Sequence, residues 1–244
     1  MDCLFVGQNI IELTSVDSTN SYLTKLSLDN FLPEGTVVIT NQQLEGRGQR
    51  GNSWFSESNK SLIVSVLLLP KIDLKRQFLF NKFIALSVCQ AINHYGLSAK
   101  IKWPNDIFVR DKKLSGILVE NIVRSNIIDK SIVGIGVNIN NNLKAIPNAT
   151  SLELYLKNPP SINELLVVLC EKIEKNYFLF KQDSALINQL YHENLYMKEQ
   201  LQMFVKGEES FSGVIKFVNE SGQLVVDVDG QQEFYNMGDI KFMI

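Results

Sequence analysis

The segment 46–54 combines residue types suited to holding an anion. Three glycines and two arginines fall within residues 46–51, and Asn52, Ser53 and Trp54 follow. Glycine lets backbone N–H groups approach a ligand closely, and arginine offers a planar fork of donors for carboxylate or phosphate oxygens. The segment therefore predicts a site for an anionic small molecule, with a solvated flexible loop as the alternative.

The same residues, Gly46 to Gly51, also satisfy G-x-G-x-x-G, the pattern of dinucleotide-binding folds. That pattern requires a strand before it and a helix at its end. A strand is expected at 36–40, but a polar loop and another apolar strand follow the glycines. Asp73, the candidate ribose acid, precedes a long helix instead of ending a strand. We therefore reject a dinucleotide-binding fold.

A second group of chemically active side chains lies between residues 102 and 113. Lys102, Asn105, Asp106 and Lys113 flank a predicted hairpin whose turn is Asp111-Lys112. A hairpin brings such positions together, so two amines and a carboxylate can converge on one site. A charged hairpin tip in solvent is the alternative.

Two further segments offer polar groups to a ligand. Asp17-Ser18-Thr19-Asn20 lies where a predicted strand meets a helix, with Ser18 as the N-cap. Hydroxyl and amide groups beside free helix N–H donors suit a polar ligand, although simple capping is the favoured explanation of this segment taken by itself. Gly134, Gly136 and Asn138 lie inside a predicted strand, where glycine marks a bulge or a close approach.

Composition excludes several other functions. The net charge of −2 and the pI near 5.8 lack the basic surface expected of a nucleic-acid-binding protein. The most apolar run, 62–69, is too short to span a membrane, and the N-terminus lacks a signal-peptide pattern. We therefore expect a cytoplasmic protein with no DNA partner and no membrane partner.

The rare reactive residues give no metal or histidine chemistry. The cysteines, Cys3, Cys89 and Cys170, are widely spaced, so neither a disulfide framework nor a zinc site is predicted. His94 and His192 both lie in helical patterns, and we interpret both as structural or facing solvent.

Strands and helices that alternate along most of the chain must position these groups. Strands are expected at 10–14, 36–40, 61–69, 100–103, 107–110, 117–123 and 131–140, and helices at 18–28, 73–95, 161–181 and 184–194. From residue 200, short alternating strands with turns at 219–222 and 229–230 predict a small five-stranded barrel.

Five motifs, in their order and spacing, resemble the motif set of the biotin protein ligases. These are Asp17-Ser18-Thr19-Asn20 with Gln43, the 46–54 loop, 102–106, 113–120 and 134–138. The resemblance covers essentially the whole chain. It implies an α+β fold, a mixed sheet with packed helices related to class II aminoacyl-tRNA synthetases, followed by an SH3-like barrel. The implied domains are a catalytic domain at 1–196 and the barrel at 197–244.

The resemblance also implies a two-step reaction. Biotin's carboxylate attacks the α-phosphate of ATP to give biotinyl-5'-AMP and pyrophosphate. A lysine of a biotin carboxyl carrier domain, from acetyl-CoA carboxylase or a similar biotin-dependent carboxylase, then takes the biotinyl group. ATP use implies Mg2+, whose ligands the sequence does not identify. The protein is expected to be either a monomer or a homodimer.

Site residues carry over by the same resemblance, position by position. Catalysis falls to Lys113, Arg47 and Asp106. Biotin binding falls to Ser18, Thr19, Asn20, Gln43, Gly46, Arg47, Lys113, Gly116 and Gly134. ATP or adenylate binding falls to Arg47, Gly48, Arg50, Trp54, Lys102, Asn105, Lys113 and Asn138. Asp106 either orients or deprotonates the incoming lysine, or helps to hold Mg2+.

Two departures from the family pattern stand out. Many relatives have arginine where this chain has Gln49, so one loop cation is absent. Some relatives carry an N-terminal helix-turn-helix, whereas the catalytic pattern here begins at Asp17, so no DNA-binding domain is expected.

Two other functions compete with biotin ligation. A lipoate or octanoate ligase would use the same catalytic fold, but the Arg-Gly loop and the Trp-Pro-Asn-Asp block favour the biotin branch. A non-enzymatic biotin or nucleotide sensor would keep the pocket, but the presence of both Lys113 and Asp106 argues against it. In the favoured interpretation, the 46–54 loop is a lid that closes over biotinyl-AMP.

Overall fold

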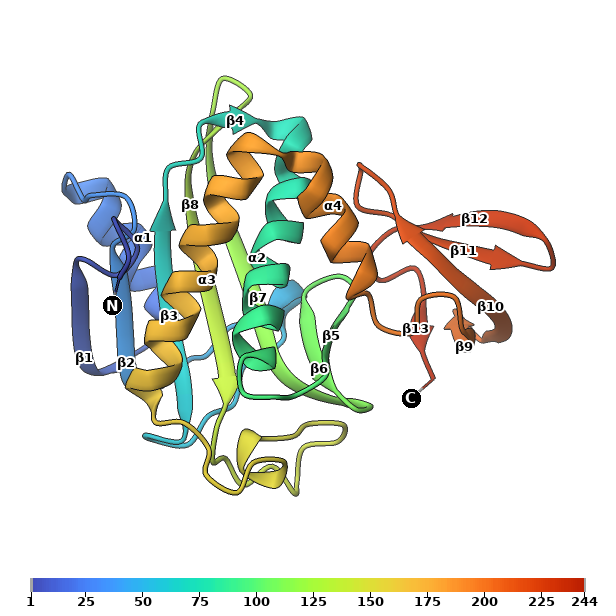
Figure 1. Cartoon of the computed structure of the whole chain (residues 1–244), viewed down its shortest axis with the longest axis horizontal. Coiled ribbons are helices and arrows are strands. Elements are labelled where there is room, and N and C mark those ends of the chain that lie inside the picture. The colour runs from blue at the N-terminus through green and yellow to red at the C-terminus, as the bar shows by residue number, and fades with distance from the viewer. Residues whose placement is uncertain (1, 244) are drawn as a thin grey trace.

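A computed structural model describes residues 2–243 and shows a mixed sheet with helices, followed by a smaller antiparallel sheet (Figure 1). The predicted domain limits at Met1 and Ile244 lie outside the described residues. The large sheet has the order β1-β2-β3-β8-β7-β6-β5, and the short β4 pairs with β8. β1 runs parallel to β2, and the other paired strands are antiparallel. The strands are β1 (Ile10–Val16), β2 (Val37–Gln43), β3 (Ser61–Leu68), β4 (Ile72–Asp73), β5 (Ala99–Lys102), β6 (Asp106–Val109), β7 (Lys112–Arg124) and β8 (Ile127–Asn138).

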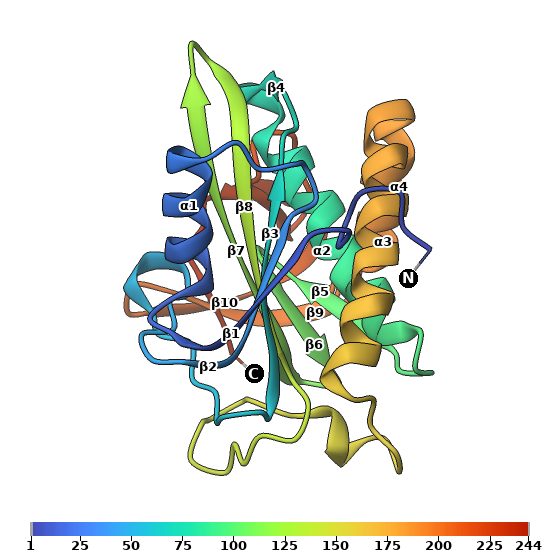
Figure 2. The same cartoon turned by 90° about the vertical axis from the view of Figure 1, so that its left-hand side faces the viewer.

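Helices cover both faces of this sheet. Figure 2 shows α1 on one face and α2 with α3 on the other. The helices are α1 (Thr19–Asp29), α2 (Gln77–Asn93), α3 (Ile162–Gln182) and α4 (Ser184–Glu193). On the α2 side, Phe80 and Phe83 pack against Phe180 of α3, with ring centroids 5.9 and 5.3 Å away. These fully buried rings hold α3 against α2.

Local capping signals define most helix starts as the sequence predicts. Ser18 accepts a hydrogen bond from the N–H of Ser21, and Ser161 forms the predicted capping box with Glu164. The helix predicted from residue 73 differs: Asp73 caps a short 3-10 turn by accepting from the N–H of Lys75, and α2 begins only at Gln77. A short polar side chain at residue 73 satisfies the nearest free N–H, which here belongs to a tighter turn.

The C-terminal residues form the predicted small β unit. Its strands are β9 (Leu201–Lys206), β10 (Glu209–Val218), β11 (Leu224–Val228), β12 (Gln231–Tyr235) and β13 (Lys241–Phe242). They form a five-stranded sheet with the order β12-β11-β10-β9-β13. Within residues 2–243, no pairing joins β12 to β13, so hydrogen bonding does not close these strands into a barrel. Of the helices in the same range, none has both the length and the apolar character needed to cross a bilayer.

The end of β10 anchors this small sheet to α2 and α4. Lys82 of α2 is only 2% exposed, and its Nζ donates to the carbonyl of Val218 and to Asn188 Oδ1, both at 2.7 Å. His192 Nε2 accepts from the N–H of Val218 at 3.1 Å and lies 3.5 Å from the Lys82 ammonium. The backbone carbonyl and N–H of Val218 are therefore both held by side chains of the helical layer.

A second anchor joins the following turn to the large sheet. The indole N–H of Trp103 donates to the carbonyl of Gly222 at 2.9 Å. A side chain at Gly222 would collide with the ring of Phe78, so only glycine allows the turn to come this close. The small sheet therefore packs directly beside the Trp-Pro-Asn-Asp segment that the sequence predicts to be functional.

Burial of the His192 contact makes docking of the small sheet sensitive to pH. Desolvation, helped by the nearby Lys82 ammonium, lowers the pKa of His192 from 6.5 to about 4. Desolvation also lowers the pKa of Lys82 to about 8. Between pH 6.5 and 4, His192 is therefore protonated in the unfolded chain but not in the folded chain. The free energy of unfolding consequently falls as pH falls through this range.

We predict that His192→Gln removes this part of the pH dependence. The free energy of unfolding of the wild type, from urea titrations at pH 7 and pH 4.5, should drop more than that of the variant. His94→Gln, which removes the histidine outside this contact, is the control and should follow the wild type. An equal drop in wild type and His192→Gln would contradict the assignment.

Candidate active site

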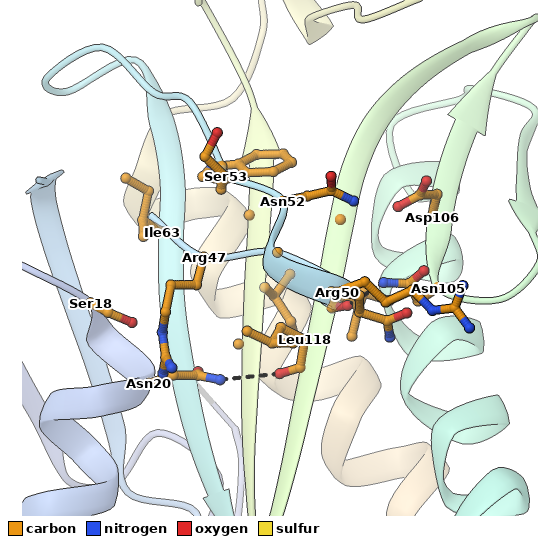
Figure 3. Close-up of a pocket in the computed structure, with 18 of the residues that line it drawn as sticks. Ser18, Asn20, Arg47, Arg50, Asn52, Ser53, Ile63, Asn105, Asp106 and Leu118 are labelled. Carbon is orange, nitrogen blue, oxygen red and sulfur yellow. Dashed lines mark hydrogen bonds between the residues drawn. The ribbon is translucent and has the colours of Figure 1, made fainter. Parts of the chain in front are cut away.

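A cavity of about 240 Å3 lies where the sheet meets the 46–54 loop (Figure 3). It brings together most of the predicted site residues, although they come from distant parts of the chain. Those that line it are Ser18, Thr19, Asn20, Gln43, Arg47, Gly48, Arg50, Trp54, Asn105, Asp106, Lys113, Gly116 and Gly134.

Three glycines lie in the part of the sheet that forms the floor of the cavity. The register of β7 against β8 places Gly116 opposite Gly136, and Leu118 opposite Gly134. A Cβ on Gly136 would overlap the indole of Trp54, and one on Gly116 would lie 3.1 Å from its ring. The three glycines therefore admit groups that would otherwise clash with the sheet. For Gly134 and Gly136, this is the close approach that their position inside a predicted strand indicates.

Trp54 lies on this floor with its N–H unused. Its indole Nε1 is buried and has no hydrogen-bond partner within residues 2–243. A buried donor without a partner is costly, so a ligand acceptor at this point would relieve the cost. The ring centroid is 5.9 Å from Lys113 Nζ, which places a cation beside the same ring.

One end of the cavity is a neutral hydrogen-bonding wall. The N–H and hydroxyl of Thr19 point at Gln43 Oε1, at 3.0 and 3.2 Å. Ser18, Thr19 and Asn20 are nearly completely buried. Ser18 both caps α1 and faces the cavity, so the capping and ligand interpretations of this segment are compatible.

The opposite end carries an ion pair. Lys113 Nζ lies 2.7 Å from Asp106 Oδ1, across the antiparallel pair β6–β7. Asn105 donates from Nδ2 to the carbonyl of Ile117 at 2.6 Å, which fixes the residue before Asp106 against β7. The hairpin thus brings Asn105, Asp106 and Lys113 to the cavity as the sequence predicts, whereas Lys102, the second predicted amine, does not line it.

The 46–54 loop folds as a tight hairpin rather than an open coil. The N–H of Gly48 donates to Asn52 at 2.7 Å, and the N–H of Trp54 donates to Gly46 at 2.8 Å. Arg47 pairs with Glu120 at 3.2 Å. Arg50, whose φ of 55° lies in the left-handed region, donates from Nη2 to the carbonyl of Met237 in the turn between β12 and β13. Whether the loop moves as a lid stays a prediction.

Three predicted site residues lie outside the lining. Gly46 sits at the base of the loop, where a Cβ would collide with the carbonyl of Trp54. Lys102 places its ammonium over the rings of Phe108 and Phe242, 5.2 and 4.5 Å from their centroids, and burial lowers its pKa.

Asn138 is the third of these residues, and its amide is occupied by the protein itself. Its Nδ2 donates to the carbonyl of Thr150 at 3.0 Å, and its Oδ1 accepts from Asn141 at 2.8 Å. A contact of Asn138 with adenine therefore stays a prediction that would require these hydrogen bonds to rearrange.

Sequence reasoning assigned no role to several residues at or beside the cavity. Ser65 and Glu120 are polar residues in predicted strands, but no local pattern predicts which face of the sheet their side chains occupy. Met237 and Gly238 line the cavity from the turn between β12 and β13, and no local signal could place them there.

Fold and cavity together define a protein of the biotin and lipoate ligase class. The pattern of the Biotin/lipoate A/B protein ligase family matches residues 12–138, more than half of the 244-residue chain. The chain belongs to this family.

The chain is also similar to individual ligases. "Bifunctional ligase/repressor BirA" of Bacillus subtilis is 34% identical over 153 residues, covering 60% of this chain and 47% of that protein. "Biotin--[acetyl-CoA-carboxylase] ligase" of Mycobacterium tuberculosis is 24% identical over 230 residues, covering 91% of this chain and 85% of that protein. The chain thus spans about half the length of the Bacillus relatives.

Among solved structures, "Biotin protein ligase from Aquifex aeolicus in complex with biotin and ATP" superposes with a TM-score of 0.79 at 26% identity. The match covers 96% of this chain and 98% of that one. It confirms the predicted fold, a mixed sheet with packed helices followed by a small antiparallel sheet.

We predict that Gly238→Ala loosens the loop by displacing Arg50. A Cβ on Gly238 would overlap the Arg50 guanidinium, whereas one on Gly230 would meet nothing within 4 Å. The two glycines have φ values of 86° and 84°, so Gly230→Ala is a control with the same backbone strain. Trypsin cleavage after Arg50, followed by mass spectrometry, should accelerate about fivefold in Gly238→Ala, the effect of losing about 1 kcal/mol of hydrogen bonding. Equal cleavage in the two variants would contradict the contact.

Proposed function

We propose that this protein is a biotin protein ligase, which makes biotinyl-5'-AMP from biotin and ATP and transfers biotin to a lysine of a carrier domain. The observation that carries the proposal is one cavity with a neutral hydrogen-bonding wall at one end and the Lys113–Asp106 pair at the other. Family membership and the likeness to the Aquifex protein solved with biotin and ATP support it.

The cavity matches the parts of the two substrates. Gln43, Ser18, Thr19 and Asn20 offer donors and acceptors for the ureido ring of biotin, and the glycine floor leaves room for its aliphatic tail. Gly46, Gly116 and Gly134 complete the biotin site. The loop then covers the adenylate, whose further binding residues are Gly48, Arg50, Trp54, Lys102, Asn105 and Asn138.

In the first step, a carboxylate oxygen of biotin forms a bond to the α-phosphorus, and the bond to the pyrophosphate oxygen breaks. Two anions approach each other, so the barrier is lowered by fixed positive charge. Lys113 and Arg47 both line the cavity and supply this charge. Asp106 holds the Lys113 ammonium in place at 2.7 Å.

In the second step, the amine of the carrier lysine attacks the biotinyl carbonyl, and AMP leaves with the bonding electron pair. The amine must lose protons during this step, and Asp106 is the carboxylate of the lining that can accept one. Mg2+, which ATP use implies, neutralises phosphate charge when bound. Asp106 fits such an ion, because Mg2+ often takes one carboxylate and completes its shell with phosphate oxygens and water.

The proposal extends to domains, partners and location. Residues 1–196 form the catalytic domain and 197–244 the C-terminal domain. The protein partner is a biotin carboxyl carrier domain of acetyl-CoA carboxylase or a similar carboxylase, in the cytoplasm. No DNA partner is proposed, because a net charge of −2 gives no overall attraction to nucleic acid.

We predict that Lys113→Ala lowers biotin transfer about 100-fold or more, the usual loss when a group that stabilises transition-state charge is removed. Lys112→Ala is the matched control, since Lys112 is the neighbouring residue on β7 and is exposed. Transfer to a carrier domain is followed by mass spectrometry with biotin, ATP and Mg2+. Full activity of Lys113→Ala, or no transfer by the wild type, would refute the proposal.

Two measurements separate the competing functions. In calorimetry, lipoate should fail to displace biotin; displacement would favour a lipoate ligase. In a single turnover without carrier, the wild type should form biotinyl-AMP, which a pure sensor would not do.

A further inference from the structure

A chain of hydrogen bonds connects the neutral wall of the cavity to Arg47 of the loop. Thr19 contacts Gln43 and lies 2.8 Å from the hydroxyl of Ser65, which in turn lies 2.6 Å from Asn20 Oδ1. Asn20 Nδ2 donates to Glu120 at 2.7 Å, and Glu120 accepts from Arg47 at 3.2 Å. The residues belong to β2, α1, β3, β7 and the loop, so tertiary structure alone assembles them.

The orientation of Asn20 is determined by its neighbours. Asn20 is 3% exposed, and its Nδ2 donates both to Glu120 and to the carbonyl of Leu118, at 3.2 Å. The reverse orientation would set the amide oxygen against a carboxylate and a carbonyl, and would leave the Ser65 hydroxyl facing an NH2 group. Gly134 makes room for this amide, because a Cβ there would collide with it.

Glu120 therefore occupies a defined place in the rim of the cavity. The Asn20 amide fixes one oxygen of its carboxylate, and both oxygens lie 3.2 Å from the same nitrogen, Arg47 Nη2. Within residues 2–243, the Arg47 side chain makes no other hydrogen bond to the protein, so its Nη1 and Nε remain available to an anion. A guanidinium can thus keep its contact with Glu120 and still hold a carboxylate or phosphate.

We propose that Glu120 is a positioning residue that sets the Arg47 guanidinium at the cavity rim, with its free donors available to the reacting anions. That Arg47 binds the reacting anions rests on the proposed function. That Glu120 holds Arg47 rests on the observed contacts alone. The ion pair is weak enough to let the loop open, since the two side chains are 48% and 37% exposed and exposed pairs contribute little. Its effect is to raise the fraction of loop conformations in which Arg47 faces the cavity.

The first test uses the ligand-free protein and no activity. Glu120→Gln keeps the size of the side chain and an acceptor for Asn20, but removes the charge that holds Arg47. Hydrogen exchange of the amides of 46–54 should become about two- to fivefold faster, the range that an exposed ion pair can supply. Glu199→Gln is the matched control, because Glu199 pairs with Lys216 in the small sheet, and it should leave this exchange unchanged. Unchanged exchange in Glu120→Gln would overturn the proposal.

The second test is a double-mutant cycle on single-turnover formation of biotinyl-AMP. Glu120→Gln should lower the single-turnover rate constant at subsaturating ATP about two- to fivefold in the wild-type background and have no further effect in Arg47→Ala. If the double variant lost activity by the product of the two single losses, Glu120 would act independently of Arg47, and the proposal would be overturned. If the wild type forms no adenylate, the proposed function fails, while the exchange measurement still decides whether Glu120 holds Arg47.

Discussion

The cavity depends on the register of β8 between β3 and β7. That register places Gly134 and Gly136 opposite Ser65 and Ile63 on one side, and opposite Leu118 and Gly116 on the other. A shift of one residue would turn every side chain of a strand to the other face and fill the cavity floor. Backbone hydrogen bonds along two long strands therefore determine where a ligand can lie.

Two cationic side chains of the cavity lining, Lys113 and Arg47, are paired with carboxylates of the protein. Lys113 is held by Asp106 at one end, and Arg47 by Glu120 at the rim. Two unpaired cations facing one small cavity would repel each other, and each carboxylate reduces that cost while fixing the direction of its partner. A ligand carrying a carboxylate and phosphates then meets cations that are already oriented, so less reorganisation is needed during the reaction.

The small C-terminal sheet is part of the site as well as an attached unit. Lys82 and His192 hold the end of β10, and Trp103 holds the next turn. From this docked position, Met237 and Gly238 reach the cavity and contact Arg50. The loop that covers the cavity is consequently held at Arg47 by the large sheet and at Arg50 by the small one.

The fold class was predicted from the resemblance to the biotin protein ligases. The helix caps at Ser18 and Ser161, the hairpin that carries Asp106 and Lys113, and the glycines inside β8 were predicted from the residues themselves. These features follow from side-chain chemistry and spacing within a few residues, which local patterns record. The tertiary structure was needed to show that Arg47 contacts Glu120, 73 residues away, and that Arg50 contacts Met237, 187 residues away. In the structure, Asn138 is hydrogen-bonded to Thr150 and Asn141, and α2 begins at Gln77 rather than at residue 73. Such contacts depend on strand register and on the docking of the small sheet, which are set by many packed side chains at once and leave no local pattern in the sequence.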